Sequence, residues 1–311
     1  MIEVRDLTKH FGSTQAVDGV SFDIKNGEIL GFLGPNGAGK TTTMRVITCY
    51  LPPSGGTVTV DGLDVRTNSL AIRTRIGYLP ESAPLYADMN VVDYLLFVAE
   101  VRLIPAGERR RAVRHAIDVC GLGGELSKNV GQLSSGFRQR VGLAQAIVHD
   151  PPILILDEPT RGLDPNQIVQ IRGLIKELGR QKTVVLSTHI LSEVQAMCDR
   201  VLIIDRGKIK FDGSKEDLSY GMSGKERVFV ELRAGGDPVA HLRGLADVEA
   251  VNVVSREDGG IVRLHIDAPR GRDVRALIFG AAVQHGWTLL EMRRETVSLE
   301  DVFRQLTTNA A

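Results

Sequence analysis

Eight consecutive residues have the types and spacing of a phosphate-binding loop, G-x-x-x-x-G-K-[ST]: Gly34-Pro35-Asn36-Gly37-Ala38-Gly39-Lys40-Thr41. Glycines let successive backbone N–H groups converge on an anion, and the N-terminus of a following helix adds partial positive charge. We expect Lys40 to reach the β- and γ-phosphates and the Thr41 hydroxyl to bind Mg²⁺. The segment therefore predicts a site for a nucleoside triphosphate.

A second motif places two carboxylates directly after four large apolar residues, Ile153 to Leu156. Such a run is typical of a strand buried on both faces of a sheet, and ligands of open α/β sheets bind at the carboxyl ends of the strands. We expect Asp157 to hold Mg²⁺ through water and Glu158 to face the attacking water. The two acids should have different tasks, because adjacent side chains of a strand point to opposite sides.

The elements that must position these residues follow from the same pattern. An apolar run at residues 28–33 precedes the glycine loop, and an apolar-periodic stretch at residues 42–50 follows it. This order of strand, loop and helix predicts an α/β fold in which the loop and the acidic strand share one edge of the sheet.

The most discriminating segment is Leu-Ser-Ser-Gly-Phe-Arg-Gln-Arg at residues 133–140, here called the signature segment, which lies about 20 residues before the acidic strand. With the two preceding motifs it gives the chain a resemblance to the ABC ATPase family, the nucleotide-binding subunits of ATP-driven transporters, over residues 1 to about 218. The resemblance implies a head-to-tail sandwich of two copies, with ATP between the phosphate loop of one copy and the signature segment of the other. Ser134, the N–H of Gly136 and the following helix N-terminus would form a second anion site.

The resemblance also implies roles for residues outside these motifs. Phe11 occupies the place of an aromatic ring that stacks on adenine, although a core aromatic is the alternative. Thr42 should assist Thr41 at the phosphates. Asp164, in Gly-Leu-Asp-Pro at residues 162–165, resembles the residue that links the two sites of a dimer.

His189 follows the apolar run at residues 184–186 and matches the histidine that contacts the γ-phosphate. A histidine at a strand end is usually structural, but this one stands where a γ-phosphate sensor is expected. Lys40, Glu158 and His189 are the expected catalytic residues. Glu158 and His189 would supply general-base help and electrostatic stabilisation, while positioning and Mg²⁺ would supply most of the catalysis.

Two positions depart from the broad family pattern. Glu81, in Gly-Tyr-Leu-Pro-Glu at residues 77–81, replaces the usual glutamine, and Phe137 stands where many members have glutamine. The Glu81 carboxylate could still reach Mg²⁺ or a bound water, at the cost of altered local charge. Both changes resemble the branch that contains polysaccharide, drug and gliding-motility exporter subunits.

Composition narrows the setting of the predicted site. Lysine plus arginine and aspartate plus glutamate are balanced at 38 each, which gives no electrostatic case for nucleic-acid binding. The three cysteines, Cys49, Cys120 and Cys198, are far apart and suit packing residues of a reduced cytosolic protein. We found no apolar signal core at the N-terminus and no apolar run near the roughly 18 residues of a spanning helix.

At 311 residues the chain is long enough for two domains. The resemblance implies that residues 1–218 form a P-loop ABC cassette with a RecA-like α/β core, an antiparallel β subdomain and a helical subdomain. Hydrophobic periodicity predicts helices at residues 91–104 and 108–120. The resemblance places them against a membrane subunit, with Glu81 and its loop as the hinge. The basic run at residues 109–111 is best explained as a solvated helix face, with lipid headgroups or a partner as alternatives.

A glycine- and serine-rich stretch predicts a linker at residues 219–226, followed by a C-terminal accessory domain at residues 227–311. The predicted order βαββαβ suggests a small ferredoxin-like α+β domain, with a final helix at residues 298–306. We find no phosphate loop, metal-ligand cluster or nucleophile–base pair in this part of the sequence. Regulation, dimer support and docking to a membrane subunit remain alternative roles.

We interpret the chain as the ATP- and Mg²⁺-binding ATPase subunit of an ABC exporter. Its expected partners are a second cassette, in a homodimer or pseudo-symmetric heterodimer, and an integral membrane subunit, at the inner face of the cell membrane. The main alternative is a soluble ABC ATPase of translation or DNA maintenance. Translation members usually carry two cassettes in one chain, whereas this chain has one. DNA-maintenance members carry long coiled coils, and no sustained heptads interrupt this cassette. A pseudo-ATPase scaffold is disfavoured because Lys40, Asp157, Glu158 and His189 are all present.

Overall fold

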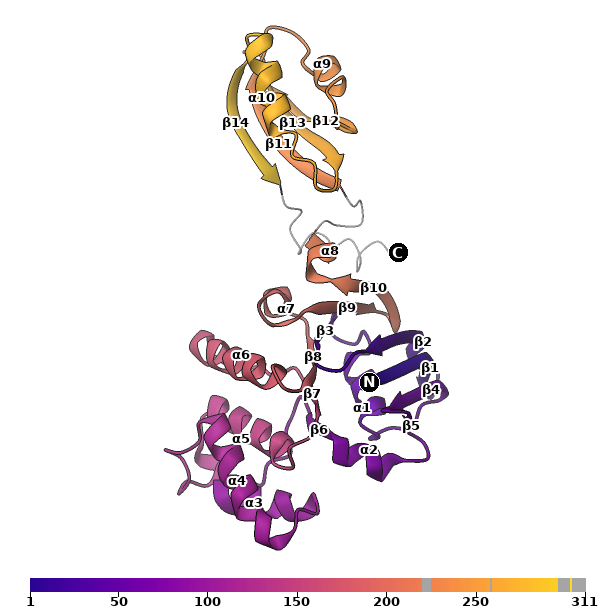
Figure 1. Ribbon diagram of the computed structural model, residues 1–311, viewed down its shortest axis with the longest axis vertical. Coiled ribbons are helices and arrows are strands. Elements are labelled where there is room, and N and C mark those ends of the chain that lie inside the picture. Colours follow the sequence, from indigo (N-terminus) through magenta and orange to yellow (C-terminus); the bar gives the residue numbers. More distant parts are fainter. Residues whose placement is uncertain (220–224, 258, 296–302, 304–311) are drawn as a thin grey trace. The chain divides into compact units, whose positions relative to one another are not determined.

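The computed structural model (Figure 1) describes residues 1–219, 225–257, 259–295 and 303. The chain divides into two compact units, Met1–Lys215 and Glu216–Ala311. Most of the linker expected at residues 219–226 lies outside the described residues. Lys225 and Glu226, which the sequence placed in that linker, are instead the first residues of a strand.

The centre of the first unit is a six-stranded sheet with the order β10-β9-β3-β8-β7-β6. Its strands are β3 (Ile29–Leu33), β6 (Ile76–Leu79), β7 (Ile153–Asp157), β8 (Thr183–Thr188), β9 (Arg200–Asp205) and β10 (Lys208–Ser214). All neighbours are parallel except β9 and β10, which are antiparallel. Every residue of β3, β7 and β8 is buried, as continuous apolar runs predict for parallel strands that are covered on both faces. This places the ends of β3 and β7 at one edge of the sheet.

A second sheet with the order β2-β1-β4-β5 is antiparallel. It consists of β1 (Ile2–Phe11), β2 (Thr14–Ile24), β4 (Gly55–Val60) and β5 (Leu63–Asp64). Helix α1 (Lys40–Ile47) contributes Met44 to a hydrophobic core that it shares with both sheets, through residues such as Phe22 and Phe32. Both sheets therefore pack against the helix that begins at the phosphate loop.

The helical subdomain contains α3 (Val91–Val101), α4 (Ala106–Cys120) and α5 (Ser135–Ile147), as Figure 1 shows. The first two confirm the predicted helices, although α3 ends three residues before the predicted end at Ile104. The remaining helices of the unit are α2 (Ser69–Arg75), the 3₁₀ turn η1 (Val130–Gln132), α6 (Pro165–Gly179) and α7 (Leu191–Met197). Among the described residues, every helix is too short or too polar to cross a membrane.

Helix α8 (Lys215–Ser219) starts at the last residue of the first unit and continues into the second. The second unit contains an antiparallel sheet with the order β12-β13-β11-β14. Its elements are β11 (Lys225–Arg233), α9 (Val239–Arg243), β12 (Ala250–Glu257), β13 (Ile261–Pro269), α10 (Arg275–Gln284) and β14 (Thr288–Glu295). This βαββαβ order confirms the ferredoxin-like prediction. The unit has its own core around Val230, Leu264 and Ile278. The helix predicted at residues 298–306 lies outside the described residues, except for Phe303.

Candidate nucleotide site

The phosphate loop connects the end of β3 to the start of α1, as the motif predicts. Two of its glycines are required by the fold. Gly39 has a φ of 109°, and a Cβ there would lie 2.6 Å from the carbonyl oxygen of Ala16. A Cβ on Gly34 would lie 2.3 Å from the carbonyl oxygen of Ile204. Side chains at either position would displace the backbone that forms the anion cradle.

Lys40, the first residue of α1, is almost completely buried. Its Nζ donates to the carbonyl oxygens of Gly34 (2.7 Å) and Pro35 (3.2 Å), and lies 3.5 Å from Oε1 of Glu158. Burial lowers the pKa of Lys40, and the nearby Glu158 carboxylate partly offsets this effect. A buried ammonium at the start of a helix is well placed to bind a phosphate oxygen.

Asp157 ends β7 and is fully buried. Its Oδ1 accepts hydrogen bonds from Thr41 (Oγ1, 3.2 Å) and from Ser187 on β8 (Oγ, 2.5 Å). Its other oxygen, Oδ2, is buried and has no hydrogen-bond partner among the described residues. Mg²⁺ is usually bound through one or two carboxylates, waters and substrate phosphates, so the Thr41–Asp157 pair with this unpartnered oxygen fits that ion.

Glu158 lies just beyond β7 and has a left-handed backbone with φ of 51°. Glu158 therefore does not follow the alternation of strand side chains, and the carboxylates of Asp157 and Glu158 lie at the same edge of the sheet. Its N–H donates to Oγ of Ser187 (3.0 Å), and its Oε2 lies 2.9 Å from Nδ1 of His189. Its Oε1 has no hydrogen-bond partner in the described part of the chain. One carboxylate oxygen contacts His189, and the other is buried beside the Lys40 ammonium without a hydrogen bond to any described residue.

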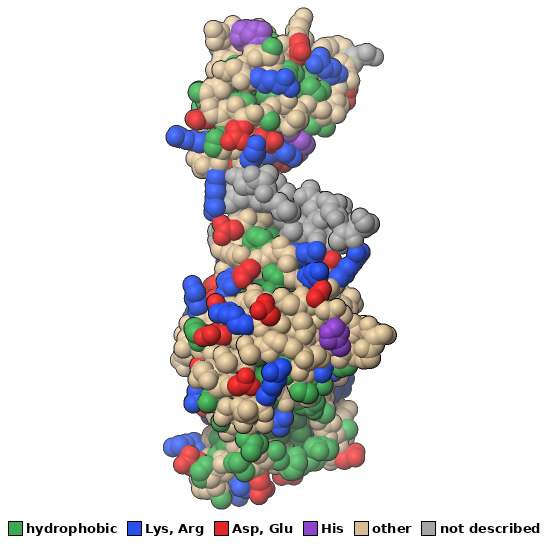
Figure 2. All heavy atoms as spheres, turned by 90° about the vertical axis from the view of Figure 1, so that its right-hand side faces the viewer, with side chains coloured by type: hydrophobic (Ala, Val, Ile, Leu, Met, Phe, Trp, Pro, Cys, Tyr) green, Lys and Arg blue, Asp and Glu red, His purple; other side chains and the backbone are tan. Residues whose placement is uncertain are grey.

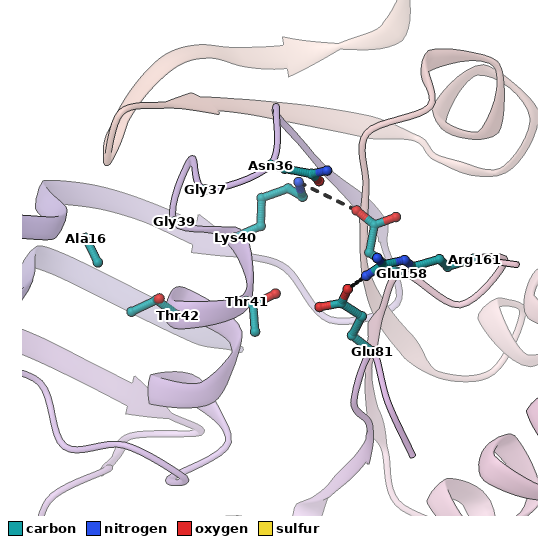
Figure 3. A pocket seen from close by; sticks show the side chains of 10 residues that line it. All are labelled: Ala16, Asn36, Gly37, Gly39, Lys40, Thr41, Thr42, Glu81, Glu158 and Arg161. Carbon is teal, nitrogen blue, oxygen red and sulfur yellow. Dashed lines mark ion pairs between the residues drawn. The ribbon is translucent and has the colours of Figure 1, made fainter. Parts of the chain in front are cut away.

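These side chains surround a cavity of about 330 Å³ (Figure 3). It is lined by Ala16, Asn36, Gly37, Gly39, Lys40, Thr41, Thr42, Glu81, Glu158 and Arg161. Seven of the lining residues come from the predicted phosphate site or acidic strand. Asp157 and His189 are outside the lining but contact Thr41 and Glu158, respectively. The structure thus brings the predicted phosphate-binding and acidic residues together.

Glu81 lies two residues beyond β6 and lines this cavity. Its carboxylate forms an ion pair with the Arg161 guanidinium, which Figure 3 shows on the far side of the cavity from Thr42. Among the described residues, no group of three or more histidine, cysteine, aspartate or glutamate residues forms a metal cluster. Coordination of Mg²⁺ by Glu81 stays a prediction.

The residues of the signature segment have local structural roles within their own chain. Ser134 caps α5 by accepting a hydrogen bond from the Phe137 N–H (3.4 Å), and a Cβ on Gly136 would lie 2.6 Å from the Gln167 side chain. Asp164 caps α6 and accepts from the Gln167 N–H (2.9 Å). All three predicted site residues lie outside the lining of the cavity, and their contact with nucleotide stays a prediction.

Phe11 is the last residue of β1 and is half-exposed, which contradicts its alternative role as a core aromatic. The Lys9 ammonium lies 5.3 Å from the centre of its ring. Phe11 is outside the lining of the cavity, and adenine stacking stays a prediction.

Sequence reasoning missed three residues at the site. Ser187 donates a hydrogen bond to the Asp157 carboxylate and accepts one from the Glu158 N–H. Arg161 forms an ion pair with Glu81. Buried Glu193 accepts hydrogen bonds from Thr160 (2.5 Å) and Thr188 (2.7 Å). Ser187 could have been found, because it follows an apolar run at the same edge as Asp157. The pairings of Arg161 and Glu193 depend on side-chain directions that spacing does not reveal.

Comparison with known proteins places this geometry in a family. The family described as "ABC transporter" matches residues 17–161. The bacitracin transport ATP-binding protein BcrA of Bacillus licheniformis is 34% identical, over 98% of this chain and 97% of its own. The Nod factor export ATP-binding protein I of Burkholderia lata is 33% identical, over 98% of this chain and 96% of its own.

A solved structure described as a dimeric post-hydrolysis state of the ATP-binding cassette MJ0796, bound to ADP and Pi, has a TM-score of 0.63 and 26% identity. The match covers 69% of this chain and 98% of that one. Fold, site and near-full-length relatives agree, and the chain belongs to the ATP-binding proteins of ABC transporters.

Proposed function

We propose that this ATPase is the energising subunit of an exporter, in which two cassettes close head to tail around Mg-ATP and act on an integral membrane subunit. The observation that carries the proposal is the cavity itself. At its edge, Lys40 and Thr41 from the start of α1 approach Glu158 and Asp157 from the end of β7.

The residues of the cavity suit phosphoryl transfer to water. Lys40 and the loop N–H groups would bind the phosphates, and Thr41 and Asp157 would hold Mg²⁺, which neutralises charge on the phosphate oxygens when bound. Glu158 is oriented by Ser187 and His189. Its Oε1, which lies beside the Lys40 ammonium and makes no hydrogen bond to a described residue, would accept a proton from water. His189 would also contact the γ-phosphate.

The signature segment supports the proposed dimer. Ser134 and Gly136 stand at the N-terminus of the 13-residue helix α5, where partial positive charge favours an anion. Since they are outside the cavity of their own chain, the arrangement suits a site completed by a partner. The dimeric cassette described above has the same fold.

A groove of about 720 Å³ in the cassette suits a membrane subunit. Its walls come from the segment that follows α1, from α2, β6, residues 84–86 and α3, and from one residue of α5. Several lining side chains are largely exposed, including Tyr50, Leu70, Tyr86, Val101 and Leu103. Figure 2 shows hydrophobic side chains gathered on the lower part of the cassette. Exposed apolar patches of this kind mark interaction sites, and we place the docked subunit here, at the inner face of the cell membrane.

The test is co-purification of the tagged chain with integral membrane proteins of its own cells. Val101→Glu places a charge in the groove, and Val169→Glu, a similarly exposed valine on α6 outside the groove lining, is the matched control. We expect Val101→Glu to reduce recovery of the complex while both variants bind Mg-ATP normally. Equal recovery for both would refute the docking site, and failure of the unaltered chain to bind any membrane protein would refute the transport role.

A further inference from the structure

The cavity contains an ion pair that the family motifs do not assign. Glu81 follows β6 and Arg161 follows β7, two parallel neighbours whose residues Leu79 and Leu156 are paired. The Arg161 N–H donates to the carbonyl oxygen of Glu158 (3.1 Å), so a turn fixes where its side chain begins. The pair therefore joins two adjacent strand ends across the wall of the nucleotide cavity (Figure 3).

Charge balance explains why an arginine stands here. Three carboxylates, Glu81, Asp157 and Glu158, lie at this edge of the sheet. Lys40 pairs with Glu158, and Arg161 pairs with Glu81. The usual residue at position 81 in the resembled family is a neutral glutamine, which needs no counter-ion. The glutamate adds one negative charge beside the Mg²⁺ site, and the guanidinium cancels it.

The pair is also able to exchange partners. The side chains of Arg161 and Glu81 are 59% and 32% exposed. Ion pairs with this much solvent contact are weak, so a dication can compete for the carboxylate without leaving a buried charge unpaired. By contrast, Lys40 and Glu158 are 5% and 7% exposed and form a closed pair.

We propose that Arg161 is a positioning residue that sets the affinity of the site for Mg²⁺ by competing for the Glu81 carboxylate. The inference rests on the Mg²⁺-nucleotide site proposed above. Without the guanidinium, the carboxylate is free, the site binds Mg²⁺ more tightly, and ATP without metal is repelled more strongly. Without the carboxylate, the unpaired guanidinium has the opposite effects on both ligands.

The experiment measures ATP binding to the full-length chain by calorimetry, across a Mg²⁺ titration and in EDTA. Arg161→Gln should lower the Mg²⁺ concentration for half-maximal ATP binding by about three- to fivefold and weaken binding in EDTA. Glu81→Gln should shift both quantities in the opposite direction, and the double variant should return close to the unaltered protein. Arg111→Gln, on an exposed face of α4, is the control and should change neither quantity.

Additional outcomes separate charge from folding. Arg161→Lys keeps the charge and should behave like the unaltered chain, which also covers the case in which Arg161→Gln folds poorly. Equal Mg²⁺ dependence in the two single variants, or a double variant that keeps the full shift of either single variant, would overturn the inference. If the unaltered chain binds no ATP with Mg²⁺ present, the site itself is refuted instead.

Discussion

Glu158 is oriented by its neighbours before it meets a substrate. The Ser187 hydroxyl accepts from its N–H, His189 contacts one carboxylate oxygen, and its backbone adopts a left-handed conformation that non-glycine residues rarely occupy. Strained conformations persist where the surroundings enforce them, and they gather at functional sites. At the residue scale, the structure therefore supports Glu158 as the residue that faces the attacking water.

Replacing Glu158 with glutamine should preserve Mg-ATP binding, because the phosphate loop and the Thr41–Asp157 pair remain. Hydrolysis should slow by about a hundredfold or more, since the proton acceptor is lost. The variant should also accumulate as an ATP-bound dimer in gel filtration. Glu177→Gln, an exposed position on α6, is the control; unchanged turnover in Glu158→Gln would remove the catalytic assignment.

The partly buried imidazole of His149 should make the stability of the cassette depend on pH. Its Nε2 contacts the carbonyl oxygen of Ile76 (3.2 Å), its Nδ1 is buried without a partner in the described residues, and burial lowers its pKa to about 4. A depressed histidine pKa means that the unfolded state binds more protons below pH ~6.5, so stability falls as the pH drops from about 6.5 to about 4.

The expected loss is on the order of 1–3 kcal/mol, allowing for partial solvent contact. Urea unfolding at several pH values should show a smaller loss over this window in His149→Gln. Identical pH profiles for the two proteins would show that His149 is protonated as readily in the folded state as in the unfolded one.

At the scale of elements, close packing between α5 and β6 connects the signature segment to the central sheet. A Cβ on Gly77 would lie 2.1 Å from the carbonyl oxygen of Ala146 in α5. Gly77→Ala should therefore destabilise the cassette by about 1–3 kcal/mol, because backbone must move. Gly107→Ala, on α4 with no atom within 4 Å of the added Cβ, is the control and should leave stability unchanged or slightly higher. Thermal unfolding compares them, and equal midpoints would contradict this packing.

The sequence predicts elements well where one pattern dominates. The loop at residues 34–41 and the apolar run before Asp157 correctly predicted which residues meet at one edge of the sheet, because both motifs depend on local residue types. Tertiary contacts decided the rest. The backbone of Glu158 leaves the strand conformation, so the alternation of strand side chains predicts the wrong direction for its carboxylate. Arg161 contacts Glu81 only because β6 and β7 are neighbouring strands. Lys225 and Glu226 look like linker residues, but they pair with Pro269 and Ala268 in a sheet.

At the scale of the whole molecule, all the residues proposed to contact nucleotide lie in the unit Met1–Lys215. Within one copy, the signature residues Ser134 and Gly136 are separate from the cavity that contains Lys40. We propose that a complete ATP site is built from two copies, each of which contributes a different half. This composite site is the central claim, because it makes ATP the ligand that closes the dimer.

The most direct test is ATP stoichiometry in a mixed dimer that carries Lys40→Ala in one copy and Ser134→Arg in the other. Both lesions then fall in one composite site, while the second site is intact. Homodimers of either single variant, in which both sites are damaged, are the controls. We predict that the mixed dimer retains ATP at one site only. Two ATP bound per mixed dimer, with normal closure, would contradict the shared site.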